Sequence, residues 1–168
     1  MCNLYSHTKG PKTIRDIANA MGVGVGWLDL TGNLEPQPAI FPDQLAPVVR
    51  SSPTGERELI KMRWGFPSPP RAKSEITTNV REPKKGFWKH WLQESHRCIV
   101  PVTSFCEYDW RSGKAVPTWF ALDDTRPLFF FAGIWRPFFG ERQREGGEHL
   151  LFAFLTTRGV PPVPRLKL

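Results

Sequence analysis

Proline and glycine restrict the fold of this 168-residue chain more than any other feature, because 17 prolines and 14 glycines are spread along it. Proline fixes its own φ angle and removes a backbone donor, and glycine favours turns, so long uninterrupted helices are excluded. The length fits one domain that buries about two thirds of its unfolded surface. We therefore expect a single α+β domain, predominantly β, with short elements joined by turns.

Hydrophobic periodicity predicts two short helices. Apolar residues recur at helical spacing within residues 13–21, and Gly22 can end that helix. A second, shorter helix is expected around residues 88–92, which carry two tryptophans and a leucine. The glycine-rich segment 22–26 follows a helix and lacks the Lys-Ser/Thr ending of a phosphate-binding loop, so we interpret it as an ordinary loop.

Alternating side chains predict most of the remaining chain as strands. Segments 45–50 and 58–64 form a hairpin through the turn at 51–55, and the proline-punctuated stretch 33–43 is expected at an edge. Further strands are predicted at 4–6, 98–108, 117–122, 128–135 and 149–157, whereas 68–74 is expected to be a loop. Their spacing indicates a curled or barrel-like antiparallel sheet with no second domain.

The charge of the chain favours a polyanionic partner. Lys and Arg number 23 against 16 Asp and Glu, which gives a net charge of +7. Nucleic acid is the leading candidate if the basic side chains converge on one face, and a merely soluble basic surface is the alternative. The residues in question are Arg50, Arg57, Arg63, Arg71, Arg81 and Lys84.

Three cysteines, Cys2, Cys98 and Cys106, form no even-numbered disulfide framework, which fits a reducing compartment. Neither an 18-residue apolar run nor a basic-then-apolar N-terminus is present. We expect a cytoplasmic monomer without a membrane partner. The cysteines and His96 do not match a zinc-ligand spacing, so no metal or other cofactor is expected.

Cys2 directly follows the initiator methionine, and removal of Met1 would leave a free amine and a free thiol on one residue. An α-amino group has a pKa near 8, so about a tenth of it is neutral at pH 7 and able to attack an aldehyde. The thiol can then close onto the imine and form a thiazolidine ring. The alternative is an accidental cysteine at position 2.

Several short motifs, in order, resemble one family over nearly the whole chain. They are Met-Cys at 1–2, the segment 33–36, Met-Arg-Trp-Gly at 62–65, Thr-Asn-Val-Arg at 78–81, the run 97–107 and Phe-Ala-Gly-Ile-Trp at 131–135. This pattern resembles the SRAP domain, the SOS response-associated peptidase family. The resemblance implies autocatalytic removal of Met1, followed by cross-linking of Cys2 to abasic sites in single-stranded DNA.

The resemblance also implies roles for individual residues. Asn79 would orient the Cys2 amine, and Glu107, on the face it shares with Phe105, would relay protons if burial favours its protonated form. Arg81 would hold a DNA phosphate, and Trp64 would face a base. The alternatives are an Asx turn for Asn79, a solvated edge position for Glu107 and a core position for Trp64.

The end of the sequence departs from the family pattern. The family has a histidine roughly ten residues beyond the strand that carries Thr156 and Thr157, followed by Met-Pro, and residues 158–168 contain neither. We interpret this ending as a truncation or altered reading frame that would impair proton transfer. Two other functions remain open at this point: a thiol peptidase acting on other proteins, and a catalytically inactive module that binds single-stranded DNA.

Overall fold

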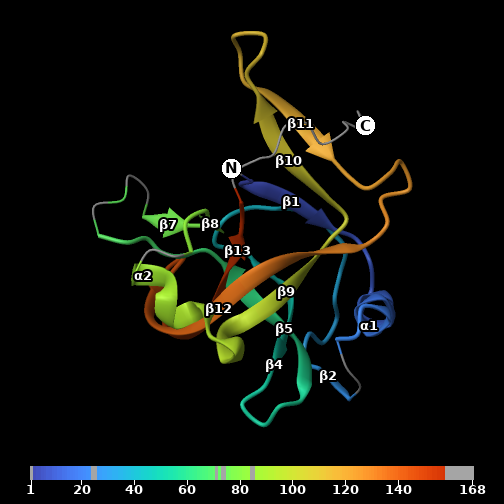
Figure 1. Cartoon of the computed structure of the whole chain (residues 1–168), viewed down its shortest axis with the longest axis vertical. Coiled ribbons are helices and arrows are strands. Elements are labelled where there is room, and N and C mark those ends of the chain that lie inside the picture. Colours follow the sequence, from blue (N-terminus) through green and yellow to red (C-terminus); the bar gives the residue numbers. More distant parts are fainter. Residues whose placement is uncertain (1, 24–25, 71, 73–74, 84–85, 158–168) are drawn as a thin grey trace.

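A closed barrel of five strands forms the centre of the protein (Figure 1). The structure, a computed structural model, describes residues 2–23, 26–70, 72, 75–83 and 86–157. Around the barrel the strands are β5 (Arg57–Trp64), β4 (Leu45–Ser51), β9 (Arg97–Val102), β12 (Phe129–Arg142) and β13 (Glu145–Leu155). The predicted single, mostly β domain with a barrel-like sheet is therefore confirmed.

The barrel is mixed, whereas the sequence predicted antiparallel pairing throughout. Each neighbouring pair from β5 to β13 is antiparallel, but β13 closes the barrel by pairing parallel to β5 at Leu151 and Phe152. An odd number of alternating strands cannot close without one parallel pair. The expectation failed because the number of strands in the ring determines this pair, and local periodicity does not reveal that number.

The parallel seam continues into a second pairing. After Phe152, β13 leaves β5 and pairs parallel with β8 (Asn79–Val80), so that Phe154 lies opposite Asn79. A further short strand, β2 (Trp27–Asp29), pairs parallel with the first residues of β5, Arg57 to Leu59. The seam therefore brings Asn79 next to the last residues of β13.

A second sheet lies at one end of the barrel, and its hairpin projects away from it (Figure 1). Its order is β11 (Val116–Phe120), β10 (Ser104–Asp109), β1 (Leu4–His7) and β3 (Gln37–Ile40). The strand predicted at 98–108 is in fact β9 and β10, which separate at Thr103 as the chain leaves the barrel. The proline-punctuated segment supplies edge strand β3, as predicted.

Helices are few and short. The predicted first helix is confirmed as α1 (Pro11–Ala20), which buries Ile14 and Ala18. The second is one turn, α2 (Gly86–Lys89), followed by the 3₁₀ turns η1 (His90–Leu92) and η2 (Glu94–His96). No helix in the described part of the chain is long and apolar enough to cross a membrane. Residues 24–25 of the expected glycine loop lie outside the described residues.

The short pair β6 (Phe66–Pro67) and β7 (Ile76–Thr77) flanks the segment that was expected to be a loop. Of that segment, residues 71, 73 and 74 lie outside the described residues. The last two strands, β12 and β13, are both longer than predicted and form one hairpin.

Strand β1 fills the end of the barrel with an aromatic side chain. Tyr5 is fully buried, and its ring centroid lies 4.9 Å from that of Trp64 and 5.3 Å from that of Phe154. Cys2 belongs to the same hydrophobic cluster. The packing of Tyr5 therefore fixes the first residues of the chain at the mouth of the barrel.

We predict that Gly65→Ala destabilises the fold. Gly65 has φ +127°, and a Cβ there would overlap Ile76 Cγ2 where the chain passes from β5 to β6. Strained backbone and overpacking together should lower the free energy of unfolding by about 2–4 kcal/mol. Chemical denaturation measures this loss.

Gly86→Ala is the matched control, because a Cβ at Gly86 meets no atom within 4 Å. Its free energy of unfolding should stay within about 1 kcal/mol of the wild-type value, since alanine is the better helix former. Equal losses in the two variants would contradict the steric explanation for Gly65.

Candidate functional site

A cleft of about 430 Å³ opens at the mouth of the barrel, where the predicted site residues Cys2, Asn79, Arg81 and Glu107 come together. They come from the start of the chain, from β8 and the residue after it, and from β10. The full lining is Cys2, Asn79, Arg81, Phe105, Glu107, Phe131, Phe154, Leu155, Thr156 and Thr157. The sequence thus predicted four members of one cleft, while their chemical roles stay predictions.

Asn79 holds the backbone of Cys2 in place. Its side-chain Nδ2 donates to the carbonyl oxygen of Cys2 at 2.7 Å and to Thr78 Oγ1 at 2.8 Å. Its Oδ1 is buried and has no hydrogen-bond partner among the residues that the structure describes. Such an unpaired buried acceptor costs about 1–3 kcal/mol, so this oxygen is well suited to receive an additional donor.

The Cys2 thiol is neutral in this environment. Cys2 is buried, and its Sγ donates to the carbonyl oxygen of Leu4 at 3.3 Å. Burial raises the pKa of the Cys2 thiol to about 12, and the negative charge of Glu107 adds to this rise. The thiol therefore stays protonated at neutral pH, and the thiolate is not the resting nucleophile.

Glu107 is half-buried at the edge of an aromatic wall. Phe105 shares its strand face, as predicted, and packs at ring-centroid distances of 5.4 Å from Phe120 and 5.3 Å from Phe131. A smaller cavity of about 220 Å³ is also lined by Glu107, together with Asp109 and Thr118. The carboxylate thus borders both the Cys2 cleft and a second, smaller cavity.

Trp64 does not face the cleft, and its predicted role as a base-facing aromatic is wrong. The residue is fully buried, its Nε1 donates to the carbonyl oxygen of Thr78 at 3.3 Å, and its ring packs between Tyr5 and Phe154. The alternative of a core tryptophan is correct. An indole in that position has no face left on which a base could stack.

Five lining residues escaped the sequence-based prediction: Phe131, Phe154, Leu155, Thr156 and Thr157. Alternation along β13 gives Phe154 and Thr156 the same parity, which could have indicated a shared face. Thr156 Oγ1 is buried without a hydrogen-bond partner in the described part of the chain, so the cleft holds a second unpaired polar group.

The basic residues do not converge as a group. Arg57 Nε donates to the carbonyl oxygen of Val23, Arg50 Nε pairs with Glu58 at 2.9 Å, and Arg63 bonds to the carbonyl oxygen of Asp43. Arg71 and Lys84 lie outside the described residues. Of the candidates that are described, Arg81 alone lines the Cys2 cleft.

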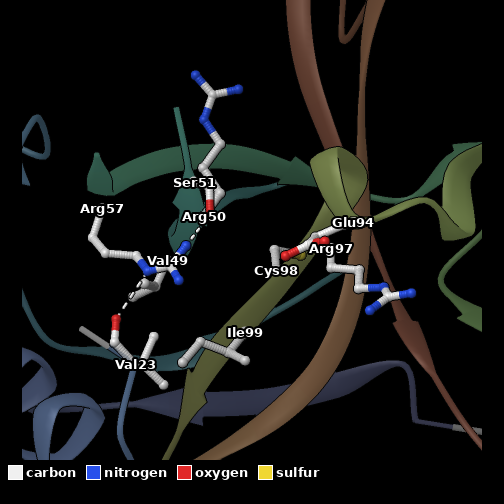
Figure 2. Close-up of a pocket in the computed structure, with 9 residues that line it drawn as sticks. All are labelled: Val23, Val49, Arg50, Ser51, Arg57, Glu94, Arg97, Cys98 and Ile99. Atoms are coloured by element: carbon white, nitrogen blue, oxygen red, sulfur yellow. Dashed lines mark hydrogen bonds between the residues drawn. The ribbon is translucent and has the colours of Figure 1, made fainter. Parts of the chain in front are cut away.

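A separate pocket of about 210 Å³ shares no lining residue with this cleft (Figure 2). Its guanidinium groups diverge: those of Arg50 and Arg97 point away from Arg57, which lies between Val23 and Ser51. Arg50 also stacks on Trp135 at 4.1 Å. These arginines stabilise the surrounding structure and do not form a common anion site.

No three His, Cys, Asp or Glu side chains lie close enough together to hold a metal ion in the described ranges. The departure expected at residues 158–168 falls outside those ranges.

Comparison with known proteins gives the family of this chain. The family model described as SOS response associated peptidase (SRAP) matches residues 1–167. The chain also resembles a solved protein from Bordetella bronchiseptica, with 22% identity, a TM-score of 0.67 and coverage of 94% of this chain and 73% of that one. No curated protein matches it.

Two further solved structures are similar. A protein from Bacteroides thetaiotaomicron has 23% identity and a TM-score of 0.64, with 93% of this chain and 68% of that chain covered. A phage-related protein from Bordetella bronchiseptica has 19% identity and a TM-score of 0.64, with coverages of 93% and 69%. At these identities the structures show the fold, and the family match shows the membership. The chain therefore belongs to the SRAP family, the SOS response associated peptidases, and this membership supports a DNA-damage-associated function of the SRAP type.

Proposed function

We propose that this protein captures abasic sites in single-stranded DNA by forming a covalent cross-link through Cys2 after removal of Met1. The observation that carries the proposal is the single cleft that brings Cys2, Asn79 and Glu107 together, with exposed Arg81 at its edge. Membership of an SOS-response family supports a damaged-DNA substrate.

The first step is attack by the freed amine of Cys2 on the open-chain aldehyde of the abasic sugar. An amine attacks through its nitrogen lone pair, so an acceptor for its N–H, such as Asn79 Oδ1, orients the lone pair toward the carbon. A C–N bond forms, and the resulting carbinolamine loses water to give an imine. Glu107 is placed to donate the proton that the departing hydroxyl needs and to take it back from the amine.

The thiol closes the ring in the second step. Sγ bonds to the imine carbon, its proton passes to the nitrogen, and a five-membered thiazolidine results, with no oxidant or reductant involved. Because burial keeps the thiol protonated, the amine reacts first and the thiol second. The wall of Phe105, Phe131 and Phe154 limits water in the cleft, which favours loss of water from the carbinolamine.

Removal of Met1 is the step that makes this chemistry available, because the nitrogen of Cys2 is not nucleophilic while it is part of a peptide bond. In that hydrolysis a water oxygen adds to the Met1 carbonyl carbon, and the Cys2 nitrogen leaves as the amine with a proton. We assign proton transfer in this step to Glu107, which lines the cleft beside Cys2.

A thiol peptidase that acts on other proteins fits the cleft less well. Such an enzyme needs a histidine base beside its thiol. None of the described residues that line the cleft is a histidine, and the Cys2 pKa is raised, not lowered.

The main prediction is a heat-stable adduct between the Met1-processed protein and single-stranded DNA that carries one abasic site. Cys2→Ala should give no heat-stable adduct, because its free amine can form only a reversible imine and no thiol remains to close the ring. Glu107→Gln, which keeps the shape but cannot relay protons, should slow the reaction about a hundredfold. Denaturing gel electrophoresis of heated samples measures the adduct.

Two outcomes would point to the other functions. Salt-sensitive DNA binding without any adduct would indicate a binding module. Cys2-dependent cleavage of an unrelated peptide, again without an adduct, would indicate a thiol peptidase.

We also predict slow alkylation of Cys2 in the folded protein with Met1 retained. A thiol with the ordinary pKa of 9.0 is half ionised at pH 9, whereas one with a pKa of about 12 is not, so Cys2 should react about 500-fold more slowly than in denaturant. The raised pKa also means that the contribution of this thiol to stability is complete below pH 9 and declines as the pH rises toward 12. Iodoacetamide labelling followed by peptide mass analysis gives the rates, and equal rates in the folded and denatured protein would rule out a buried neutral thiol.

For Arg81→Ala we predict weaker DNA binding with a flatter salt dependence, by about one phosphate contact. The control is Arg15→Ala, because Arg15 is an exposed arginine on α1 that does not line the cleft. Fluorescence titrations over a range of salt concentrations measure both slopes. If the two variants give the same slope as the wild type, Arg81 does not contact the DNA backbone.

A further inference from the structure

The side-chain amide of Asn79 has both of its hydrogens committed. Nδ2 donates to the Cys2 carbonyl oxygen and to Thr78 Oγ1, and a primary amide carries only two N–H groups. Asn79 is 6% exposed, and its Oδ1 has no partner in the described structure. The nitrogen end of the amide is therefore fixed, and the oxygen end is left for a donor in the cleft.

The hydroxyl of Thr78 has a defined direction. Its single hydrogen goes to Asn3 Oδ1, with an oxygen–oxygen distance of 3.0 Å. A hydroxyl that has donated its hydrogen presents only lone pairs to its other neighbours. Toward Asn79, Thr78 is therefore an acceptor, and it can face only the NH₂ end of that amide.

Thr78 is itself held firmly. Its carbonyl oxygen accepts from Trp64 Nε1 at 3.3 Å and from the backbone nitrogen of Phe154 at 2.9 Å, and the residue is 7% exposed. By contrast, the other partner of the Asn79 amide is the carbonyl of Cys2, the residue that must react. Thr78 is thus the partner that does not take part in the chemistry.

We propose that Thr78 is a positioning residue that fixes which end of the Asn79 amide faces the cleft. The inference rests on the proposed function, in which Asn79 Oδ1 accepts a hydrogen from the freed Cys2 amine. A reversed amide would point N–H groups at the amine, where they would bind the lone pair that has to attack the aldehyde. It would also set Oδ1 against the Thr78 lone pairs and the Cys2 carbonyl.

The test compares Thr78→Val, which keeps the branched shape but has no hydroxyl, with Thr78→Ser, which keeps the hydroxyl. In single-turnover cross-linking of the Met1-processed protein, Thr78→Val should be slowed about tenfold or more, since a misplaced reacting group can cost up to about a hundredfold. Thr78→Ser should stay within about threefold of the wild-type rate. The affinity for single-stranded DNA without an abasic site should not change in either variant.

A double variant distinguishes an effect of Thr78 through Asn79 from a general loss of structure. If Thr78 acts only through Asn79, Thr78→Val should cause no further slowing in an Asn79→Ala background. Additive losses in the double variant would overturn the inference. A merely structural role for Thr78 predicts that additivity.

A second measurement does not depend on DNA. In the wild-type protein both Nδ2 hydrogens of Asn79 should exchange slowly with solvent in side-chain amide NMR spectra, and in Thr78→Val one of them should exchange at least about tenfold faster because it has lost its acceptor. Unchanged exchange would overturn the inference even if cross-linking occurs. Should the wild type form no adduct while exchange responds as expected, the proposed function fails and the orienting contact stands.

Asn3→Ala provides a variant that should fold readily, because Asn3 is exposed. It removes the acceptor that directs the Thr78 hydroxyl, and it should speed exchange of the same Asn79 hydrogen and slow cross-linking, both by less than Thr78→Val. If Thr78→Val does not fold, this variant decides the question: wild-type exchange in Asn3→Ala would contradict the proposed hydrogen-bond chain.

Discussion

The packing of Tyr5 against Trp64 and Phe154 is the interaction on which the rest of the site depends. Strand β1 is not a barrel strand, and terminal residues are usually poorly ordered unless something holds them. A fully buried tyrosine removes about 150–250 Å² from water, an upper estimate of about 4–6 kcal/mol at about 25 cal/mol per Å². That anchor lies three residues from Cys2, so the fold itself places Cys2 at the cleft.

The closure of the barrel supplies the other side of the site. Because five strands require one parallel pair, β13 runs alongside β5 and then passes on to β8. This change of pairing partner sets Asn79 opposite Phe154. The carbonyl oxygen of Thr78 accepts hydrogen bonds from Trp64 and from the backbone of β13. Asn79 therefore reaches Cys2 because of the way the ring closes, and any change that altered the register of this seam would move the amide away from the N-terminus.

Local patterns in the sequence were enough to predict the elements but not how they join. Helical spacing predicted α1, alternation predicted the β4–β5 hairpin, and the order of short motifs identified Cys2, Asn79, Arg81 and Glu107. Alternation could not show that the chain changes sheets at Thr103, because a single residue separates β9 from β10. At Trp64 it was the family resemblance that implied a base-facing role, whereas the side chain is fully buried in the core. The bond from Thr78 to Asn3 joins residues 75 positions apart, so no local signal reports it.

Burial has two effects on the site. It keeps the Cys2 thiol protonated, and it leaves Asn79 Oδ1 without a partner in the described structure, an arrangement that costs the folded state about 1–3 kcal/mol. A liberated amine next to that oxygen would offset this cost, because it brings new N–H donors where the peptide-bonded nitrogen had one. In this proposal the Asn79 amide is fixed, at a cost to the stability of the fold, in the orientation that binds the free amine of Cys2, which exists only after Met1 has left. Processing comes first in this proposal and aldehyde capture second, because the Cys2 nitrogen becomes nucleophilic, and a donor of several hydrogens, only after Met1 has left.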